Sequence, residues 1–105
     1  MVKNNQLMES PTPSSNQIRV HVFVAGKVQG VGYRYTTMSR ARELGLNGWV
    51  RNLPDSRVEA VFEGVQEVVE QMISWCHSGP SGAVVKDVVV EYEKVEGLQT
   101  FEVKL

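Results

Sequence analysis

The sequence has a single cysteine, Cys76, so no disulfide can form within the chain. A lone cysteine is typical of proteins from reducing compartments, and we expect a cytoplasmic location. No apolar run approaches the roughly 18 residues needed to span a bilayer, so a membrane protein is not indicated. The formal net charge of only −1 excludes a strong overall attraction to nucleic acids or to anionic membranes. An anion-binding site in this chain must therefore be local.

Histidines are also scarce. His21 and His77 are the two in the chain, and no cysteine or carboxylate cluster accompanies either at metal-ligand spacing. We therefore expect neither a metal nor a cofactor, and we place His21 on the open face of a sheet. Cys76 begins a segment that superficially resembles a cysteine-phosphatase loop. Gly82, however, stands where that loop needs an arginine, and Cys76 belongs to the apolar stripe of a helix, so a structural cysteine is the better interpretation.

The 105 residues, 42% of them hydrophobic, suffice for one domain with a modest core. Residues 1–17 are polar, with two prolines among serines and asparagines, and they lack the apolar centre of a secretory signal. We expect this segment to be a disordered polar tail. Residues 18–105 form the expected domain.

Hydrophobic periodicity predicts five strands and two helices in residues 18–105. Alternating apolar residues mark the strands, and apolar residues recurring every three to four positions mark the helices. The expected order is a strand over 18–24, a helix over 35–44, strands over 46–53 and 57–63, a helix over 65–76, and strands over 83–92 and 98–105. Each helix has one apolar stripe, so both should cover the same face of one antiparallel sheet. This is the ferredoxin-like α+β arrangement, a split β-α-β sandwich with a short final strand.

The most informative segment is the glycine-rich turn between the first strand and the first helix, Gly-Lys-Val-Gln-Gly-Val-Gly-Tyr-Arg at 26–34. It offers no Ser, Thr, Asp or Asn to cap the helix, so the first backbone N–H groups are free to face an anion. Arg34 follows in the first helical turn, where the helix dipole disfavours a cation by up to about 1 kcal/mol. This combination predicts a site for a phosphate-like anion. A plain structural turn is the alternative interpretation.

Two familiar nucleotide-binding motifs do not match this turn. A Walker A loop needs Gly-Lys followed by Ser or Thr at the helix start, but Lys27 is followed by a valine at the beginning of the loop. A Rossmann fingerprint needs a third glycine three residues after Gly32, where Tyr35 stands. RNA binding is not indicated either, because residues 58–62 of the third strand contain one aromatic residue and an acid.

The same nine residues resemble the signature G-x-V-Q-G-V-x-[F/Y]-R of the acylphosphatases. A second segment, Leu-Gly-Leu-Asn-Gly-Trp-Val-Arg-Asn at 44–52, is similar to that family's following block, which ends in a functional asparagine. The resemblance covers about residues 18 to 105. It implies an enzyme that hydrolyses acyl phosphates, the mixed anhydrides of a carboxylic acid and phosphate, to a carboxylate and inorganic phosphate. It also implies direct attack by water, without a metal or a covalent intermediate.

The resemblance assigns roles residue by residue. Arg34 would hold the phosphoryl oxygens, and Asn52 would position the attacking water. Backbone N–H groups would complete the cradle, from Gln29 through Gly30, Val31 and Gly32 to Tyr33. The expected partners are a small acyl phosphate as substrate and inorganic phosphate as product, without nucleic acid or membrane, and we expect a monomer. For the whole chain, a catalytically silent domain that binds a phosphorylated metabolite is the alternative.

The turn after Asn52 departs from the family's pattern. Relatives often have glycine after the aspartate of this turn, and this chain has Ser56. If the backbone there needs a positive φ, serine costs on the order of 1 kcal/mol. We expect that cost to fall on the turn, although Asn52 lies close enough for its placement to suffer. Its neighbour Arg51 should point to the opposite face of the sheet.

Overall fold

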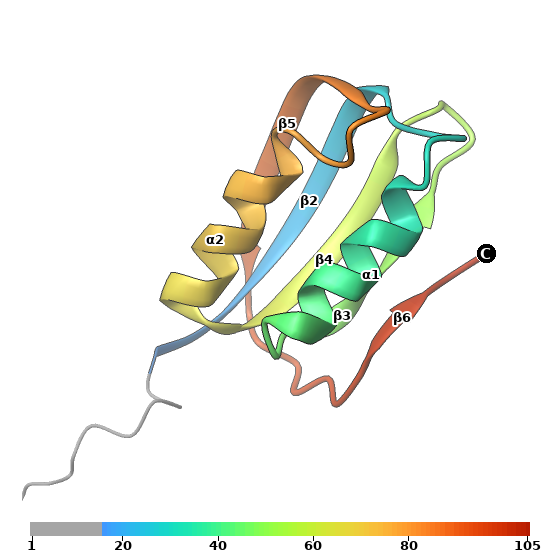
Figure 1. Cartoon of the computed structure of the whole chain (residues 1–105). Coiled ribbons are helices and arrows are strands. Elements are labelled where there is room, and N and C mark those ends of the chain that lie inside the picture. Colours follow the sequence, from blue (N-terminus) through green and yellow to red (C-terminus); the bar gives the residue numbers. More distant parts are fainter. Residues whose placement is uncertain (1–15) are drawn as a thin grey trace, which may run out of the picture.

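The structure, a computed structural model, describes residues 16–105 (Figure 1). The predicted tail falls almost entirely on residues outside this range. Gln17, which the prediction places at the end of the tail, is the first residue of the first described strand, β2 (Gln17–Lys27). That strand continues three residues past its predicted end and leads directly into the glycine-rich turn.

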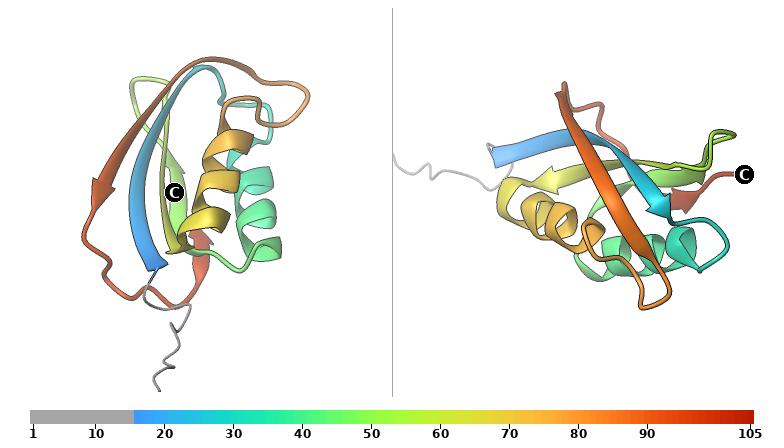
Figure 2. Two further views of the ribbon diagram at one scale, coloured as in Figure 1. Left: turned by 90° about the vertical axis from the view of Figure 1, so that its left-hand side faces the viewer. Right: turned by 90° about the horizontal axis from the view of Figure 1, so that it is seen from above.

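The described chain forms five strands and two helices in the predicted order. After β2 come α1 (Tyr33–Glu43), β3 (Asn47–Asn52), β4 (Val58–Val65), α2 (Gln66–Cys76), β5 (Val84–Glu93) and β6 (Phe101–Val103). Both helices pack on one face of the sheet and leave the other face open (Figure 2). The ferredoxin-like α+β prediction is confirmed. Neither helix of residues 16–105 is long and apolar enough to cross a bilayer.

All five strands belong to one sheet, in the order β5-β2-β4-β3-β6. The pairs β5–β2, β2–β4 and β4–β3 are antiparallel, as predicted. The last pair differs, because residues 101–103 of β6 run parallel to residues 48–50 of β3. β5 and β6 lie on opposite edges of the sheet, so the chain between them passes the end of the sheet and enters β6 in the direction of β3 (Figure 1).

The core lies between the sheet and the two helices. Alternate residues of β2 supply Val20, Val22 and Val24, which are fully buried. The buried stripe of α1 is narrow, with one residue in every four: Tyr33, Thr37 and Ala41. The stripe of α2 consists of Val69, Met72 and Cys76. A few buried side chains therefore fix each helix to the sheet, and the large Tyr33 ring fixes the start of α1 at the end of the glycine-rich turn.

Cys76 lies at the end of α2 with its side chain in the core. Burial raises the pKa of its thiol to about 12, so the nucleophilic thiolate is not formed near neutral pH. The prediction of a structural cysteine is confirmed.

Candidate active site

The loop between β2 and α1 presents unpaired backbone N–H groups. Gly30 and Gly32 have φ values of 77° and 79°, in the left-handed region that favours glycine. A Cβ on Gly30 would meet no atom within 4 Å, so the backbone conformation, and not the packing, requires glycine there. No N–H of residues 29–33 donates a hydrogen bond to another described backbone carbonyl. The result is a run of donors that an anion can occupy.

The helix that follows this loop begins without a side-chain cap. Its first residue is Tyr33, two positions earlier than predicted, and the capping position is Gly32, whose carbonyl oxygen accepts hydrogen bonds from Thr36. The prediction of an uncapped helix start is confirmed. Arg34 is the second residue of the helix and is half-buried, and it makes no hydrogen bond or ion pair with any described residue. Its guanidinium donors are therefore available to a ligand.

Asn52 is the last residue of β3 and reaches the same region. Its side-chain oxygen, Oδ1, is buried and has no hydrogen-bond partner among the residues described. A buried acceptor without a partner costs about 1–3 kcal/mol, so such an atom indicates a missing ligand or water. This observation sets Asn52 apart from an ordinary turn asparagine, whose side chain would bond its own backbone.

A cavity of about 580 Å³ brings these groups together. Gly30, Gly32 and Arg34 line it from the loop and the start of α1, and Asn52 lines it from β3. Of the other predicted loop residues, Tyr33 also lines the cavity, whereas the side chains of Gln29 and Val31 serve elsewhere. The remaining wall comes from α1 and the last strand: Tyr35, Met38, Arg42, Glu102, Val103 and Leu105, with Val28 at the loop entrance.

Gln29 connects the loop to the turn that follows Asn52. Its side-chain Nε2 donates to the carbonyl oxygens of Leu53 and Arg57, both at 2.9 Å. The sequence predicts only the backbone N–H of Gln29 as part of the site, and this side-chain contact was not predicted. The sequence contains only a weak signal for this contact, namely a long polar side chain in a loop whose expected role depends on backbone N–H groups.

Tyr33 and Val31 anchor the loop to the core. The Tyr33 ring is buried, and its hydroxyl donates to the carbonyl oxygen of Cys76 at 2.7 Å. Burial raises the pKa of Tyr33, so its hydroxyl remains a donor at any physiological pH. The backbone of Gly79 approaches this ring so closely that a Cβ there would lie 2.5 Å from Tyr33 Cε2. Val31 is partly buried and also packs against the core.

The turn between β3 and β4 contains the predicted strain. Ser56 has a φ of 77° and is the one non-glycine residue of the described chain with a positive φ. A bond from the N–H of Leu53 to the carbonyl oxygen of Arg57, 2.8 Å long, closes the turn. Asn52 nevertheless stays in the cavity, so the cost falls on the turn. Arg51 lies on the opposite face, as predicted, and pairs there with Glu59.

A family model described as acylphosphatase matches residues 20–103. The chain belongs to the acylphosphatase family. An acylphosphatase from Trichormus variabilis is 66% identical over 97 residues, which are 92% of this chain and 96% of that relative. Among solved structures, an acylphosphatase from Coxiella burnetii has a TM-score of 0.84 and 38% identity, covering 87% of this chain and 96% of that one. An acylphosphatase from Bacillus subtilis has a TM-score of 0.81 and 31% identity, covering 84% and 99%.

The predictions of family and enzyme class are confirmed by these similarities: the protein is an acylphosphatase-family hydrolase. In this acylphosphatase the cavity wall opposite the loop depends on Arg42. Its Nε and Nη2 donate to the carbonyl oxygen of Phe101 at 3.1 and 2.8 Å, which holds β6 against α1. The role of Arg42 was not predicted, because its partner is a backbone carbonyl 59 positions away in the sequence.

Proposed function

We propose that the cavity binds the phosphoryl group of an acyl phosphate and that water attacks the phosphorus directly. A bond forms between the water oxygen and phosphorus, and the bond between phosphorus and the carboxyl oxygen breaks. The products are a carboxylate and inorganic phosphate, with the proton released to solvent or held by the phosphate. The observation that supports this most directly is the unpartnered Oδ1 of Asn52 in the same cavity as the unpaired Arg34.

Arg34 and the loop provide the stabilisation that this reaction needs. The transition state of phosphoryl transfer spreads negative charge over three equatorial oxygens. The planar guanidinium of Arg34 offers paired donors to two oxygens, and the free N–H groups of residues 29–33 surround the remainder. Because these donors are fixed by the fold before substrate binds, little reorganisation is needed during the reaction.

The leaving group explains why the cavity can work without a general acid. A carboxylate is a weak base and departs without protonation, unlike an alkoxide. Because Arg34 and the backbone N–H groups supply positive potential directly, we propose that no metal is required. Positioning and electrostatic stabilisation then account for the rate.

Asn52 is proposed to position the water. Its Oδ1 accepts a hydrogen bond and orients the water toward the phosphorus, and the neutral amide does not add negative charge beside the phosphate. The water donates the hydrogen bond that Oδ1 does not receive from any described residue, so the same contact satisfies a buried acceptor and places the nucleophile. β3 carries Asn52 to the loop side of the sheet, where Arg34 also lies.

The deciding experiment is hydrolysis of benzoyl phosphate in the presence of a chelator, with phosphate as a competitive inhibitor. Arg34→Ala should abolish both turnover and phosphate binding, and Arg34→Lys should restore little because a point charge cannot replace the guanidinium fork. Arg40→Ala, an exposed residue of the same helix paired with Glu43, is the matched control and should keep full activity. Activity in Arg34→Ala would refute the proposed role of Arg34. A wild type that binds phosphate without hydrolysis would favour a silent binding domain.

We further propose that the protein works as a monomer in the cytoplasm, with no nucleic acid or membrane partner. The free, buried thiol of Cys76 supports a reducing compartment. Light scattering coupled to gel filtration tests the monomer, since a dimer would double the 11.7 kDa mass of the chain.

A further inference from the structure

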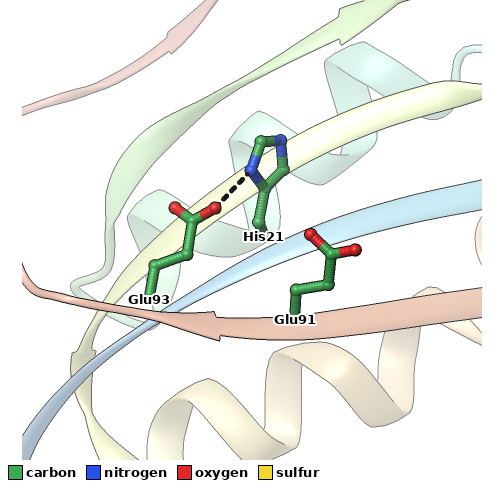
Figure 3. A group of neighbouring side chains, drawn as sticks. All are labelled: His21, Glu91 and Glu93. Carbon is green, nitrogen blue, oxygen red and sulfur yellow. Dashed lines mark hydrogen bonds and ion pairs between the residues drawn. The ribbon is translucent and has the colours of Figure 1, made fainter.

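A second cluster of polar side chains lies on the open face of the sheet, away from the helices and the cavity. His21 of β2 and two glutamates of β5, Glu91 and Glu93, converge there (Figure 3). The register places His21 opposite Glu91, and Glu93 lies two residues further along β5 and so on the same face. One ligand atom from each of the three lies within 4.8 Å of the others. None of them takes part in the proposed hydrolysis.

A fourth residue, Glu59 of β4, fixes the orientation of the imidazole. Its carboxylate lies 2.6 Å from Nε2 of His21, and only 7% of that side chain is exposed. Arg51 holds the same carboxylate from the other side. With Nε2 committed to Glu59, Nδ1 points toward β5, where it lies 2.8 Å from Glu93 (Figure 3). Metal-bound histidines typically have this arrangement, in which a carboxylate accepts the N–H of the nitrogen that does not bind metal.

Glu91 is the exposed member of the cluster whose carboxylate is free to bind a ligand. Contacts between His21 and Glu59 and between His21 and Glu93 account for two carboxylates. Glu91 makes no hydrogen bond or ion pair with any residue described, yet it lies beside the same imidazole. Even with His21 protonated, this part of the face has four carboxylates, Glu59, Glu63, Glu91 and Glu93, against three cationic groups, Arg19, Arg51 and His21. Such an excess attracts a divalent cation.

We propose that His21, Glu91 and Glu93 bind a divalent transition-metal ion of the zinc type. Nδ1 of His21 and one oxygen from each glutamate are the ligands, and water takes the fourth position. One imidazole with two carboxylates suits Zn²⁺, whereas Mg²⁺ and Ca²⁺ prefer oxygen ligands alone. Tetrahedral ligands at about 2.0–2.1 Å from zinc lie roughly 3.4 Å apart, within reach of small rotations of the exposed glutamates.

The bound ion takes the place of the proton that Nδ1 shares with Glu93, and that proton is released to solvent. The bound ion joins β5, an edge strand of the sheet, to its neighbour β2. A ligand that binds only the native state stabilises it, so the ion should raise the melting temperature. Because the cluster lies on the face opposite the helices, we expect hydrolysis in the cavity to be unchanged.

Titration calorimetry with ZnCl₂ on the metal-free full chain tests this proposal. We expect one ion per chain, no comparable heat with MgCl₂, and affinity reduced about tenfold or more in Glu91→Gln and His21→Gln. Glu91→Gln leaves the contacts of His21 with Glu59 and Glu93 intact, so it remains informative if His21→Gln folds poorly. His77→Gln, at the other histidine, is the matched control and should bind like the wild type.

The proposal fails if the wild type does not bind Zn²⁺, or if Glu91→Gln binds it as tightly as the wild type. It also fails if His77→Gln weakens binding as much as His21→Gln, because the ion would then sit elsewhere. The melting temperature gives a second readout. At the same Zn²⁺ concentration it should rise in the wild type and in His77→Gln, and should rise less in Glu91→Gln.

Discussion

Nε2 of Gln29 lies 2.9 Å from the carbonyl oxygen of Leu53, the residue that follows Asn52. A second bond of the same amide, to the carbonyl oxygen of Arg57, spans the turn. The loop between β2 and α1 and the turn that follows Asn52 are therefore held together by one side chain. We therefore expect Gln29 to be a positioning residue, which acts on the proposed reaction through Asn52.

Replacement of Gln29 by alanine should separate water positioning from phosphate binding. We expect kcat to fall about 10- to 100-fold, because small displacements of a reacting group have large effects on rate. The inhibition constant of phosphate should change little, since the loop N–H groups and Arg34 remain. Loss of two hydrogen bonds should also lower the free energy of unfolding by about 1–3 kcal/mol.

Steady-state kinetics with phosphate as inhibitor, together with urea unfolding, checks the Gln29 prediction. Gln71→Ala, an exposed glutamine of α2, is the control and should match the wild type. If phosphate binding in Gln29→Ala weakened in proportion to kcat, the glutamine would shape the anion site itself and not the position of Asn52.

Asn52→Ala should lower activity without lowering stability. Among the described residues the buried Oδ1 has no partner, so the substitution removes no hydrogen bond to the rest of the protein. We expect kcat to fall by a factor on the order of 100, while the phosphate inhibition constant and the free energy of unfolding stay close to those of the wild type. Kinetics and urea unfolding measure all three. A marked loss of stability would mean that the side chain has a structural role in the turn.

Ser56→Gly should stabilise the protein by about 1 kcal/mol, because glycine adopts a φ of 77° without the steric cost that serine has there. Urea unfolding measures the effect. Ser39→Gly, at an exposed position of α1, is the control with the opposite sign and should destabilise by about 0.5 kcal/mol. If both substitutions destabilised the protein equally, the positive φ of Ser56 would carry no cost.

Glu63 should contribute to a loss of stability in acid. Burial opposes its charge, but hydrogen bonds from the N–H groups of Glu96 and Leu98 and from Arg19 outweigh burial and lower the pKa of Glu63 below its usual 4.5. The carboxylate therefore stabilises the native state fully above about pH 4.5, and that contribution is lost as the pH falls through the lower pKa of the folded state.

Urea unfolding at a series of pH values between 6 and 3 tests this acid effect. The free energy of unfolding should fall less steeply with acid in Glu63→Gln than in the wild type. Glu67→Gln, on the exposed side of α2, should leave the slope unchanged. Equal slopes in Glu63→Gln and the wild type would show that the carboxylate of Glu63 has no part in the acid response.

The features that could be predicted from the sequence are those that depend on neighbours along the chain. The alternation that ends in Val20, Val22 and Val24 identifies a strand and its buried face, and the missing cap identifies an exposed helix start before Arg34. The helix begins two residues earlier than predicted, directly after Gly32, which has a left-handed backbone and whose carbonyl oxygen accepts the first helical hydrogen bond, from Thr36.

The features that escaped prediction depend on contacts between distant segments. Nothing near His21 in the sequence suggests a metal site, since Glu91 lies 70 positions away and only the register between β2 and β5 brings them together. The bonds from Gln29 to the turn, and the parallel direction of β6, are also set by tertiary packing. A sequence pattern specifies which face a residue occupies, but not which residue from another strand it meets.

The parallel pairing of β3 with β6 also has a consequence for the order in which the molecule is built. Gly48 pairs with Phe101, 53 positions later, so the strand that ends in Asn52 lacks its outer neighbour until the final strand has been synthesised and has docked. Closing so long a segment is entropically costly, and such contacts tend to form late. During refolding, helices and the central hairpin should therefore appear before hydrolytic activity returns, and recovered activity would time the arrival of the last strand.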